Sequence, residues 1–181
     1  LNSSDEDQKT IPIPVETSFH DYLEQQLGLI TSLNDRQTTI AEQIIGSIDE
    51  DGYLRRDIPA IMDDLMFAQN LFVEESEIES ILKLIQQFDP PGAGARDLQE
   101  CLLIQLQHAL NSQPQSKALK LAKTILTEHF DGFTKKHYDR LIKTLEISEN
   151  ELKNSLDEIL RLNPKPASSF AGSTSKNRVQ Y

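Results

Sequence analysis

A short run near the middle of the chain, residues 88–106, sets the strongest limit on how this sequence can fold. Its adjacent prolines, Pro90 and Pro91, end any preceding helix because proline lacks an amide donor and disfavours helical geometry in the residue before it. Gly92 and Gly94 then allow a tight backbone path that residues with a Cβ resist. The sequence therefore predicts a helix, a tight turn and a second helix.

The helix after this turn begins with capping residues and is apolar on most sides. Asp97 can cap its N-terminus, and Glu100 stands three positions later, as in a capping box. Its apolar positions are Leu98, Cys101, Leu102, Leu103, Ile104, Leu106, Ala109 and Leu110. A helix that is apolar nearly all round is buried or bound on more than one side, so we expect a buried junction here.

Helical periodicity covers almost all of the chain from residue 18 onward, without the alternation typical of β-strands. Ser18 and Asn34 are candidate caps of the first two helices, and Pro59 suits the first turn of a third. A fourth helix is expected to end at Asp89-Pro90. These patterns predict an all-α fold.

The second half of the chain resembles the first in the order of its landmarks. Three landmarks recur in order at offsets of 79, 80 and 74 residues: 97–106 after 18–27, 131–133 after 51–53, and 147–164 after 73–90. We therefore predict two helical-bundle subdomains in tandem, 17–91 and 92–166, on a repeated four-helix plan. The alternative is that two amphipathic bundles resemble each other by chance.

The two ends of the sequence differ from the helical part. Residues 1–16 are acidic, polar and interrupted by prolines, which predicts a flexible linker, and the Ser-, Gly- and Lys-containing residues 167–181 predict an extended connector. Because the chain starts at Leu1, we expect it to belong to a longer protein. No apolar run of about 18 residues is present, and we expect no membrane contact. The single cysteine, Cys101, excludes an internal disulfide and fits the cytoplasm.

The net charge of −11 is concentrated in the first half. Residues 17–91 carry fifteen acidic and four basic residues, whereas residues 92–166 carry ten and eleven. A phosphate backbone would repel the first half, and a basic protein surface would be a better electrostatic partner. The simpler alternative is that the acidic surface serves solubility alone.

No arrangement of residues typical of catalysis, cofactor binding or metal binding is found. Gly92 and Gly94 lack the preceding strand and the third glycine of a dinucleotide fingerprint. A phosphate held at the start of the following helix by Arg96 is the enzymatic alternative. The histidines, none with a second ligand one turn away, are His20, His108, His129 and His137. We therefore expect a chain that is not an enzyme, with no catalytic residues, cofactor or metal.

The basic residues of the second half cluster in one stretch, which is a candidate for nucleic-acid contact. They are Lys117, Lys120, Lys123, Lys135, Lys136, Arg140 and Lys143. The first three fall roughly on one side of a predicted helix. Because no short helix-turn-helix pair is evident, a solvated helix face is the favoured interpretation.

Residues 89–102 read D-P-P-G-A-G-A-R-D-L-Q-E-C-L. This segment resembles the hallmark D-P-x-G-[VI]-[GA]-A-R-[DN]-L-x-E-C-L of the sigma-54 family, the enhancer-dependent bacterial RNA polymerase sigma factors, in their core-binding domain. Ala93 is a departure, since valine or isoleucine is common there. Residues 18–29, 48–54 and 162–166 are similar to other parts of this domain, and 1–16 resembles the family's variable linker.

The resemblance implies a module that docks on core RNA polymerase, chiefly on the β and β′ subunits. It also implies promoters with elements near −24 and −12, opened by an AAA+ activator ATPase. The activator-responsive N-terminus, the helix-turn-helix and the promoter-reading box of the family are expected outside this chain. Promoter DNA and the activator would therefore bind to other parts of the parent protein. This part is expected to be monomeric. The alternative is a non-catalytic helical adaptor that binds another protein.

The resemblance and the turn together nominate a set of junction or partner-binding residues. They are Asp89, Pro90, Pro91, Gly92, Gly94, Ala95, Arg96, Asp97 and Glu100. We expect Arg96 to anchor the turn to nearby carbonyls or acids, with direct contact to polymerase as the alternative. The candidate nucleic-acid contacts are Lys117, Lys120 and Lys123.

Overall fold

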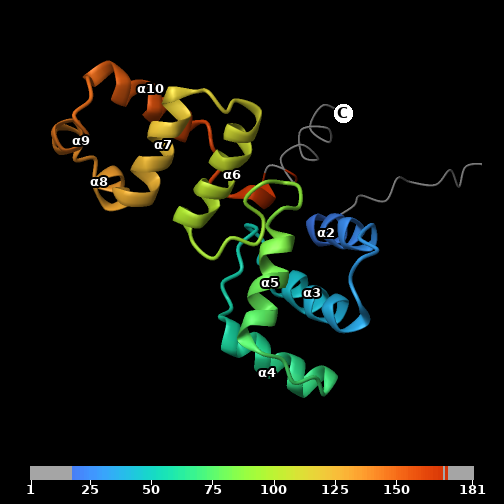
Figure 1. Cartoon of the computed structure of the whole chain (residues 1–181). Coiled ribbons are helices and arrows are strands. Elements are labelled where there is room, and N and C mark those ends of the chain that lie inside the picture. Colours follow the sequence, from blue (N-terminus) through green and yellow to red (C-terminus); the bar gives the residue numbers. More distant parts are fainter. Residues whose placement is uncertain (1–17, 169, 171–181) are drawn as a thin grey trace, which may run out of the picture.

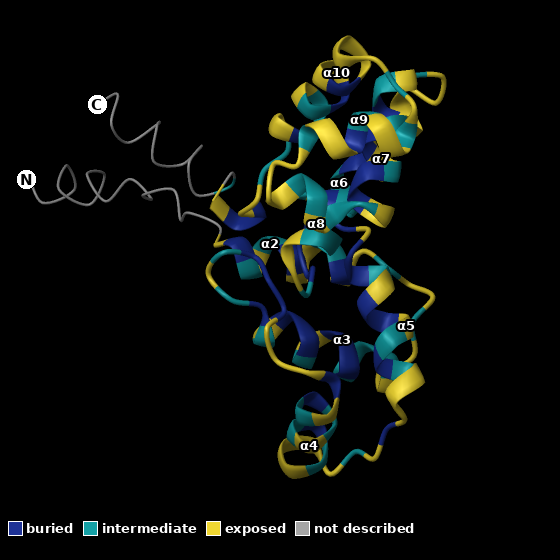
Figure 2. Ribbon diagram, turned by 90° about the vertical axis from the view of Figure 1, so that its left-hand side faces the viewer, coloured by how far each residue is buried: buried dark blue, intermediate teal, exposed yellow. Residues whose placement is uncertain are grey.

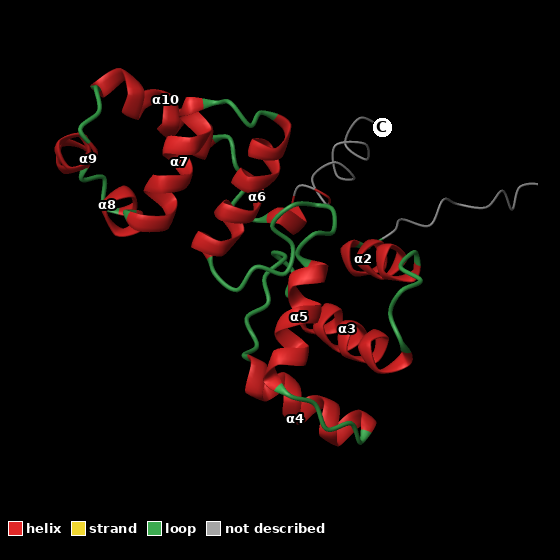
Figure 3. Cartoon of the chain, in the orientation of Figure 1, coloured by secondary structure: helices red, strands yellow, loops and turns green. Residues whose placement is uncertain are grey.

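The computed structural model describes residues 18–168 and 170, and within them the chain is helical, without a strand (Figures 1 and 3). The predicted all-α class is confirmed. The helices are α2 (Phe19–Gly28), α3 (Asp35–Ser47), α4 (Ile58–Gln69), α5 (Glu75–Ile85), α6 (Leu98–Ser112), α7 (Lys117–Glu128), α8 (Phe130–Thr134), α9 (Tyr138–Leu145) and α10 (Glu149–Leu160). The predicted linker, 1–16, and the connector beyond residue 170 lie outside the described residues.

The first helices begin at the residues that the sequence predicted as caps. The Ser18 side chain accepts a hydrogen bond from the amide of Asp21, and the Asn34 side chain accepts one from Gln37, whose own side chain returns the bond. Pro59 lies in the first turn of α4. Each arrangement satisfies or dispenses with a backbone donor that has no partner within the helix.

The predicted end of the fourth helix is wrong by a few residues. α5 ends at Ile85 rather than at Asp89, and the amides of residues 86–88 bond to carbonyls within the last turn. The chain leaves helical geometry ahead of the cis Asp89–Pro90 bond. Pro90 cannot donate a helical hydrogen bond to the carbonyl of Gln86, and it disfavours helical geometry at Asp89, so α5 cannot continue through this segment.

Two large clusters of buried side chains divide the described chain into halves, which is consistent with the predicted tandem units. Buried residues, dark blue in Figure 2, occur in the helices of both halves. One is built mainly from α2–α5 and the other from α6–α10. All extensively packed helix pairs lie within one half or the other. The second half has five helices where four were predicted, because the chain between α7 and α10 is divided into α8 and α9.

A third, small cluster lies where the halves meet. Tyr53 packs with Ala95 and Cys101, all nearly fully buried, and Ile104 covers them in part. The backbone joins there as well: the amide of Leu54 donates to the carbonyl of Ala95 at 2.9 Å. The turn after α3 is therefore bound directly to the junction.

The end of the described chain returns to the first half. Ala167, 3% exposed, belongs to the N-terminal cluster, and its amide donates to the carbonyl of Asp51 at 3.1 Å. The ring of Phe170 stacks on Tyr22 with centroids 5.5 Å apart. The first residues beyond the predicted boundary at 166 thus pack on the opposite subdomain. No helix within the described residues is both long and apolar enough to cross a membrane.

Candidate functional site: the junction between the two halves

The two glycines of the junction have positive φ angles, 97° at Gly92 and 82° at Gly94. This backbone region disfavours residues with a Cβ. A Cβ at Gly92 would also lie 2.9 Å from Nε2 of Gln105 and 3.0 Å from Sγ of Cys101. At Gly94 the nearest atom would be Cγ of Gln86, at an ordinary 3.6 Å. Gly94 is therefore required by its backbone alone, and Gly92 by backbone and space together.

Arg96 connects the helices on both sides of the junction. Its Nη1 donates to Oε1 of Glu79 on α5 at 2.7 Å, and its Nη2 donates to Oε2 of Glu100 on α6 at 2.8 Å. The hydrogen bonds to Glu100 raise the pKa of the guanidinium further above its usual range. Arg96 thus anchors the turn to two acids, as its predicted structural role requires.

The predicted capping box at the start of α6 forms only in part. Asp97 accepts from the amide of Glu100 at 2.8 Å, as expected. The Glu100 carboxylate, however, accepts from the amide and guanidinium of Arg96 rather than from the amide of Asp97. Burial acts to raise the pKa of Glu100, but the bonds from Arg96 outweigh it and leave that pKa below its usual value. The ion pair with Arg96 therefore takes the place of the second cap.

Each half has one glutamine in its first helix whose side chain bonds to the backbone at the end of that half. Gln26 of α2 donates to the carbonyl of Asp89 at 2.6 Å and accepts from its amide at 2.8 Å. Gln105 of α6 does the same to Asn163, at 2.6 and 2.7 Å. Asp89 and Asn163 each precede a proline. The sequence alignment of the two halves pairs these residues, and their shared contacts support a repeated plan.

The middle landmark of the predicted repeat, residues 51–53 and 131–133, does not have the same structure in both halves. Gly52 lies in the turn after α3, where its carbonyl accepts from the amide of Gly94 at 2.9 Å. Gly132 lies inside the short helix α8. The two halves are therefore alike at their first helix and at their last residues, whereas the segments that join these parts differ in structure.

An open cleft of about 730 Å³ lies beside the junction. Five of the predicted junction residues line it: Asp89, Pro91, Arg96, Asp97 and Glu100. Leu103 and Ile104 supply apolar wall, which explains why α6 is apolar on most sides. Of the remaining junction residues, Gly92, Gly94 and Ala95 are buried and Pro90 is partly exposed.

Lys123 is the only one of the three candidate nucleic-acid contacts among the residues that line this cleft. It donates to Oε1 of Gln107 at 2.9 Å. Lys117 and Lys120 are also exposed on α7. These positions do not test nucleic-acid contact, which stays a prediction.

The chemistry of Cys101 suits packing. Cys101 is fully buried, and burial raises the pKa of its thiol, so it remains protonated as a core side chain. No group of three or more His, Cys, Asp or Glu suited to a metal ion occurs among the described residues. The contacts of Gln105 and Tyr53 were missed from the sequence, where the signal for Gln105 was its alignment with Gln26 in the repeat.

Comparison with known proteins gives one family for nearly the whole chain. Residues 12–180 match the family described as sigma-54 factor, core binding domain. The RNA polymerase sigma-54 factor of Shewanella violacea is 36% identical over 158 residues, which cover 86% of this chain and 31% of that protein. That of Azotobacter vinelandii is 34% identical over 175 residues, covering 96% and 34%. That of Escherichia coli K12 is 33% identical over 153 residues, covering 84% and 31%. The chain spans about a third of the length of these relatives.

Proposed function

The chain belongs to the sigma-54 factor family, as its core binding domain, and on that premise we propose that it docks on core RNA polymerase and anchors a sigma factor for transcription initiation. The observation that carries this proposal is the family match over residues 12–180. The relatives are bacterial proteins named RNA polymerase sigma-54 factor. The domain itself acts as a non-catalytic docking module in the bacterial cytoplasm.

The geometry of the junction supports docking as one body. The halves are joined by a buried cluster, by Arg96 and by the returning segment at Ala167. A preformed surface loses less conformational freedom on binding than two independent modules would. The acidic first half supplies charge complementary to a basic polymerase surface.

The finer parts of the proposal follow the family resemblance. The domain contacts the β and β′ subunits. Promoter elements near −24 and −12 and the AAA+ activator ATPase are engaged by other regions of the longer sigma factor. The residues proposed to set the docking geometry are those of the junction, 89–100, and the domain docks as a monomer.

A titration of core RNA polymerase with the fluorescently labelled chain tests the proposal. At physiological salt we expect saturable binding that unlabelled full-length sigma-54 displaces. A folded, helical chain that does not bind, or binding that sigma-54 does not displace, would contradict it and favour an adaptor for another protein.

A parallel titration with duplex DNA, using the variant Lys117→Gln/Lys120→Gln/Lys123→Gln as control, tests nucleic-acid contact. Such contact would be lost in the variant and strongly weakened by salt.

A further inference from the structure

Two phenylalanines near the end of α4 are unusually exposed, Phe67 within α4 and Phe72 in the turn that follows it. Phe67 is 80% exposed and Phe72 is 68% exposed; we call this pair the aromatic tip. In Figures 1 and 2, α4 lies at the end of the first half that is remote from α6–α10. Aromatic side chains bury large areas when covered, and they dominate the energetics of many interfaces.

The turn itself directs Phe72 outward. Asn70 ends α4 in a left-handed conformation, and the amide of Leu71 bonds back to the carbonyl of Leu65 at 3.1 Å. Leu71 and Val73 then pack on the N-terminal core. Phe72, between these two packed residues, is exposed to solvent. Its exposure is thus built into a turn whose neighbours are fixed by the core.

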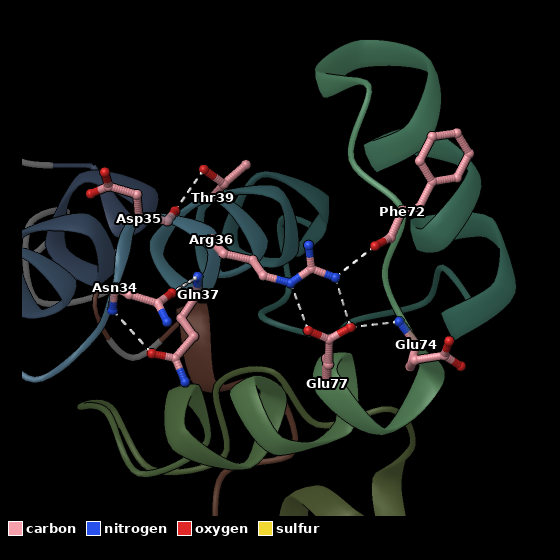
Figure 4. A network of polar contacts seen from close by, with 8 residues as sticks. All are labelled: Asn34, Asp35, Arg36, Gln37, Thr39, Phe72, Glu74 and Glu77. Carbon is pink, nitrogen blue, oxygen red and sulfur yellow. Dashed lines mark hydrogen bonds and ion pairs between the residues drawn. The ribbon is translucent and has the colours of Figure 1, made fainter.

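A polar network from α3 holds the backbone beneath Phe72 (Figure 4). Nη2 of Arg36 donates to the carbonyl of Phe72 at 2.6 Å, and the guanidinium forms two bonds with the Glu77 carboxylate, at 2.7 and 3.0 Å. Glu77 also accepts from the amide of Glu74 at 2.7 Å. The hydrogen bonds from Arg36, which have the largest effect, and the bond from the amide of Glu74 lower the pKa of Glu77 to about 2. The network is therefore charged at neutral pH and fixes the turn before any partner arrives.

The charge beside the aromatic tip is negative. Asp63, Glu74 and Glu75 are exposed on α4 and at the start of α5, and no ion pair within the described residues includes them. The nearby cations Arg36 and Arg56 are already paired, with Glu77 and Asp64 respectively. Nucleic acid and anionic bilayers would be repelled here. The complementary partner is a protein surface with an apolar pocket bordered by lysine and arginine.

We propose that the aromatic tip is an anchor by which this domain seats on core RNA polymerase, with Phe67 and Phe72 in an apolar pocket that basic side chains border. The assignment of polymerase as the occupant rests on the function proposed above. Interfaces concentrate their binding energy in a few aromatic anchors that are already held in their bound geometry. The tip combines both properties with a complementary charge.

The test is the polymerase titration repeated with Phe67→Ala, Phe72→Ala and the double variant. We expect each single substitution to weaken binding about tenfold or more, with unchanged thermal unfolding, because buried aromatic anchors cost at least this much when truncated. The matched controls are Leu29→Ala and Leu160→Ala, at positions 81% and 75% exposed elsewhere. They are expected to bind as the wild type does.

The charge of the partner is tested with Glu74→Gln/Glu75→Gln. This variant is expected to bind more weakly than the wild type and to lose part of its salt dependence. Unchanged affinity and unchanged salt dependence would refute a basic border around the pocket.

The other outcomes separate this inference from the proposed function. Wild-type binding with equally tight binding of the Phe67→Ala/Phe72→Ala variant would overturn the anchor and leave the polymerase function standing. Equal losses in the leucine controls would also overturn it. Absence of wild-type binding would overturn both. Sedimentation showing a dimer that the double variant dissociates would identify a second copy as the occupant, against the proposal.

Discussion

The hydroxyl of Tyr53 donates a hydrogen bond to the carbonyl of Pro164 at 2.5 Å, although the two residues are 111 positions apart. The Tyr53 ring meanwhile packs against Ala95, just before α6. One side chain of the first half therefore holds both the start and the end of the second. The relative placement of the halves depends on this contact together with the bonds of Arg96, the returning segment at Ala167 and the covalent link through residues 86–97.

Replacing Tyr53 with phenylalanine should keep the packing and remove the hydrogen bond. Loss of a donor to a partly buried carbonyl is expected to lower the free energy of unfolding by about 1 kcal/mol. Urea denaturation followed by circular dichroism measures it. The control is Tyr22→Phe, whose bond to Asp89 is exposed and should contribute less. Equal effects in the two variants would contradict a special role for Tyr53.

The same side chain predicts a stability change at alkaline pH. Burial raises the pKa of Tyr53 above its usual value, so its contribution is fully present below about pH 10, the ordinary tyrosine pKa. It is lost as pH rises towards the higher pKa of the folded state, because the unfolded chain releases the proton first. Tyr53→Phe should therefore lose less stability above about pH 10. Burial of Cys101 also raises its pKa, so part of the slope will remain; identical slopes would refute the prediction.

Gln26 and Gln105, which bond to the backbone at the end of each half, should contribute different amounts to the free energy of unfolding. Gln105→Ala removes both bonds to the backbone of Asn163 in a partly buried site and should cost about 2 kcal/mol. Gln26→Ala removes the exposed bonds to Asp89 and should cost about 1 kcal/mol. Gln105→Glu, which cannot donate to the Asn163 carbonyl, should resemble the alanine variant. Thermal unfolding checks the order, and a Gln105→Glu variant as stable as the wild type would contradict this account.

The local features of the fold were predictable, whereas the contacts that join the halves were not. The caps at Ser18 and Asn34 and the hallmark turn depend on residues close in sequence, where side-chain chemistry decides the backbone directly. The contact between Tyr53 and Pro164 depends on how the two folded helical bundles pack against each other. No periodicity within one helix carries that information.

The same limit explains the errors at the edges of elements. The pattern placed Phe88 in the fourth helix because apolar spacing continued to it, yet it lies in a turn after Ile85. Ala167 was assigned to a connector from its polar neighbours, and it packs in the N-terminal core instead. The aromatic tip was missed because Phe67 and Phe72 resemble core residues in sequence, and only their exposure distinguishes them.

The two junction glycines should respond differently to substitution. Gly94→Ala introduces backbone strain of about 1–2 kcal/mol without a clash, since its Cβ would meet its nearest neighbour at 3.6 Å. Gly92→Ala adds a contact at 2.9 Å with Nε2 of Gln105, and it should cost more because the Gln105 amide could move away only by breaking its bonds to Asn163. Gly94→Val, with its branched Cβ, should strain the turn further and weaken polymerase binding indirectly. Unchanged unfolding and wild-type affinity in Gly94→Val would refute the role of the junction.

The link between Arg36 and Phe72 can be measured with a double-mutant cycle on polymerase binding. If Arg36 acts by positioning Phe72, through the bond to its carbonyl, then Arg36→Ala should weaken binding several-fold in the wild-type background. It should have little further effect in Phe72→Ala, because the side chain that it positions is already gone. Arg36→Lys should restore binding poorly, since an ammonium cannot reproduce the two parallel bonds to Glu77 together with the carbonyl contact. Independent, additive losses would mean that Arg36 contacts the partner itself or acts only on stability, and unfolding measurements on the same variants separate these two explanations.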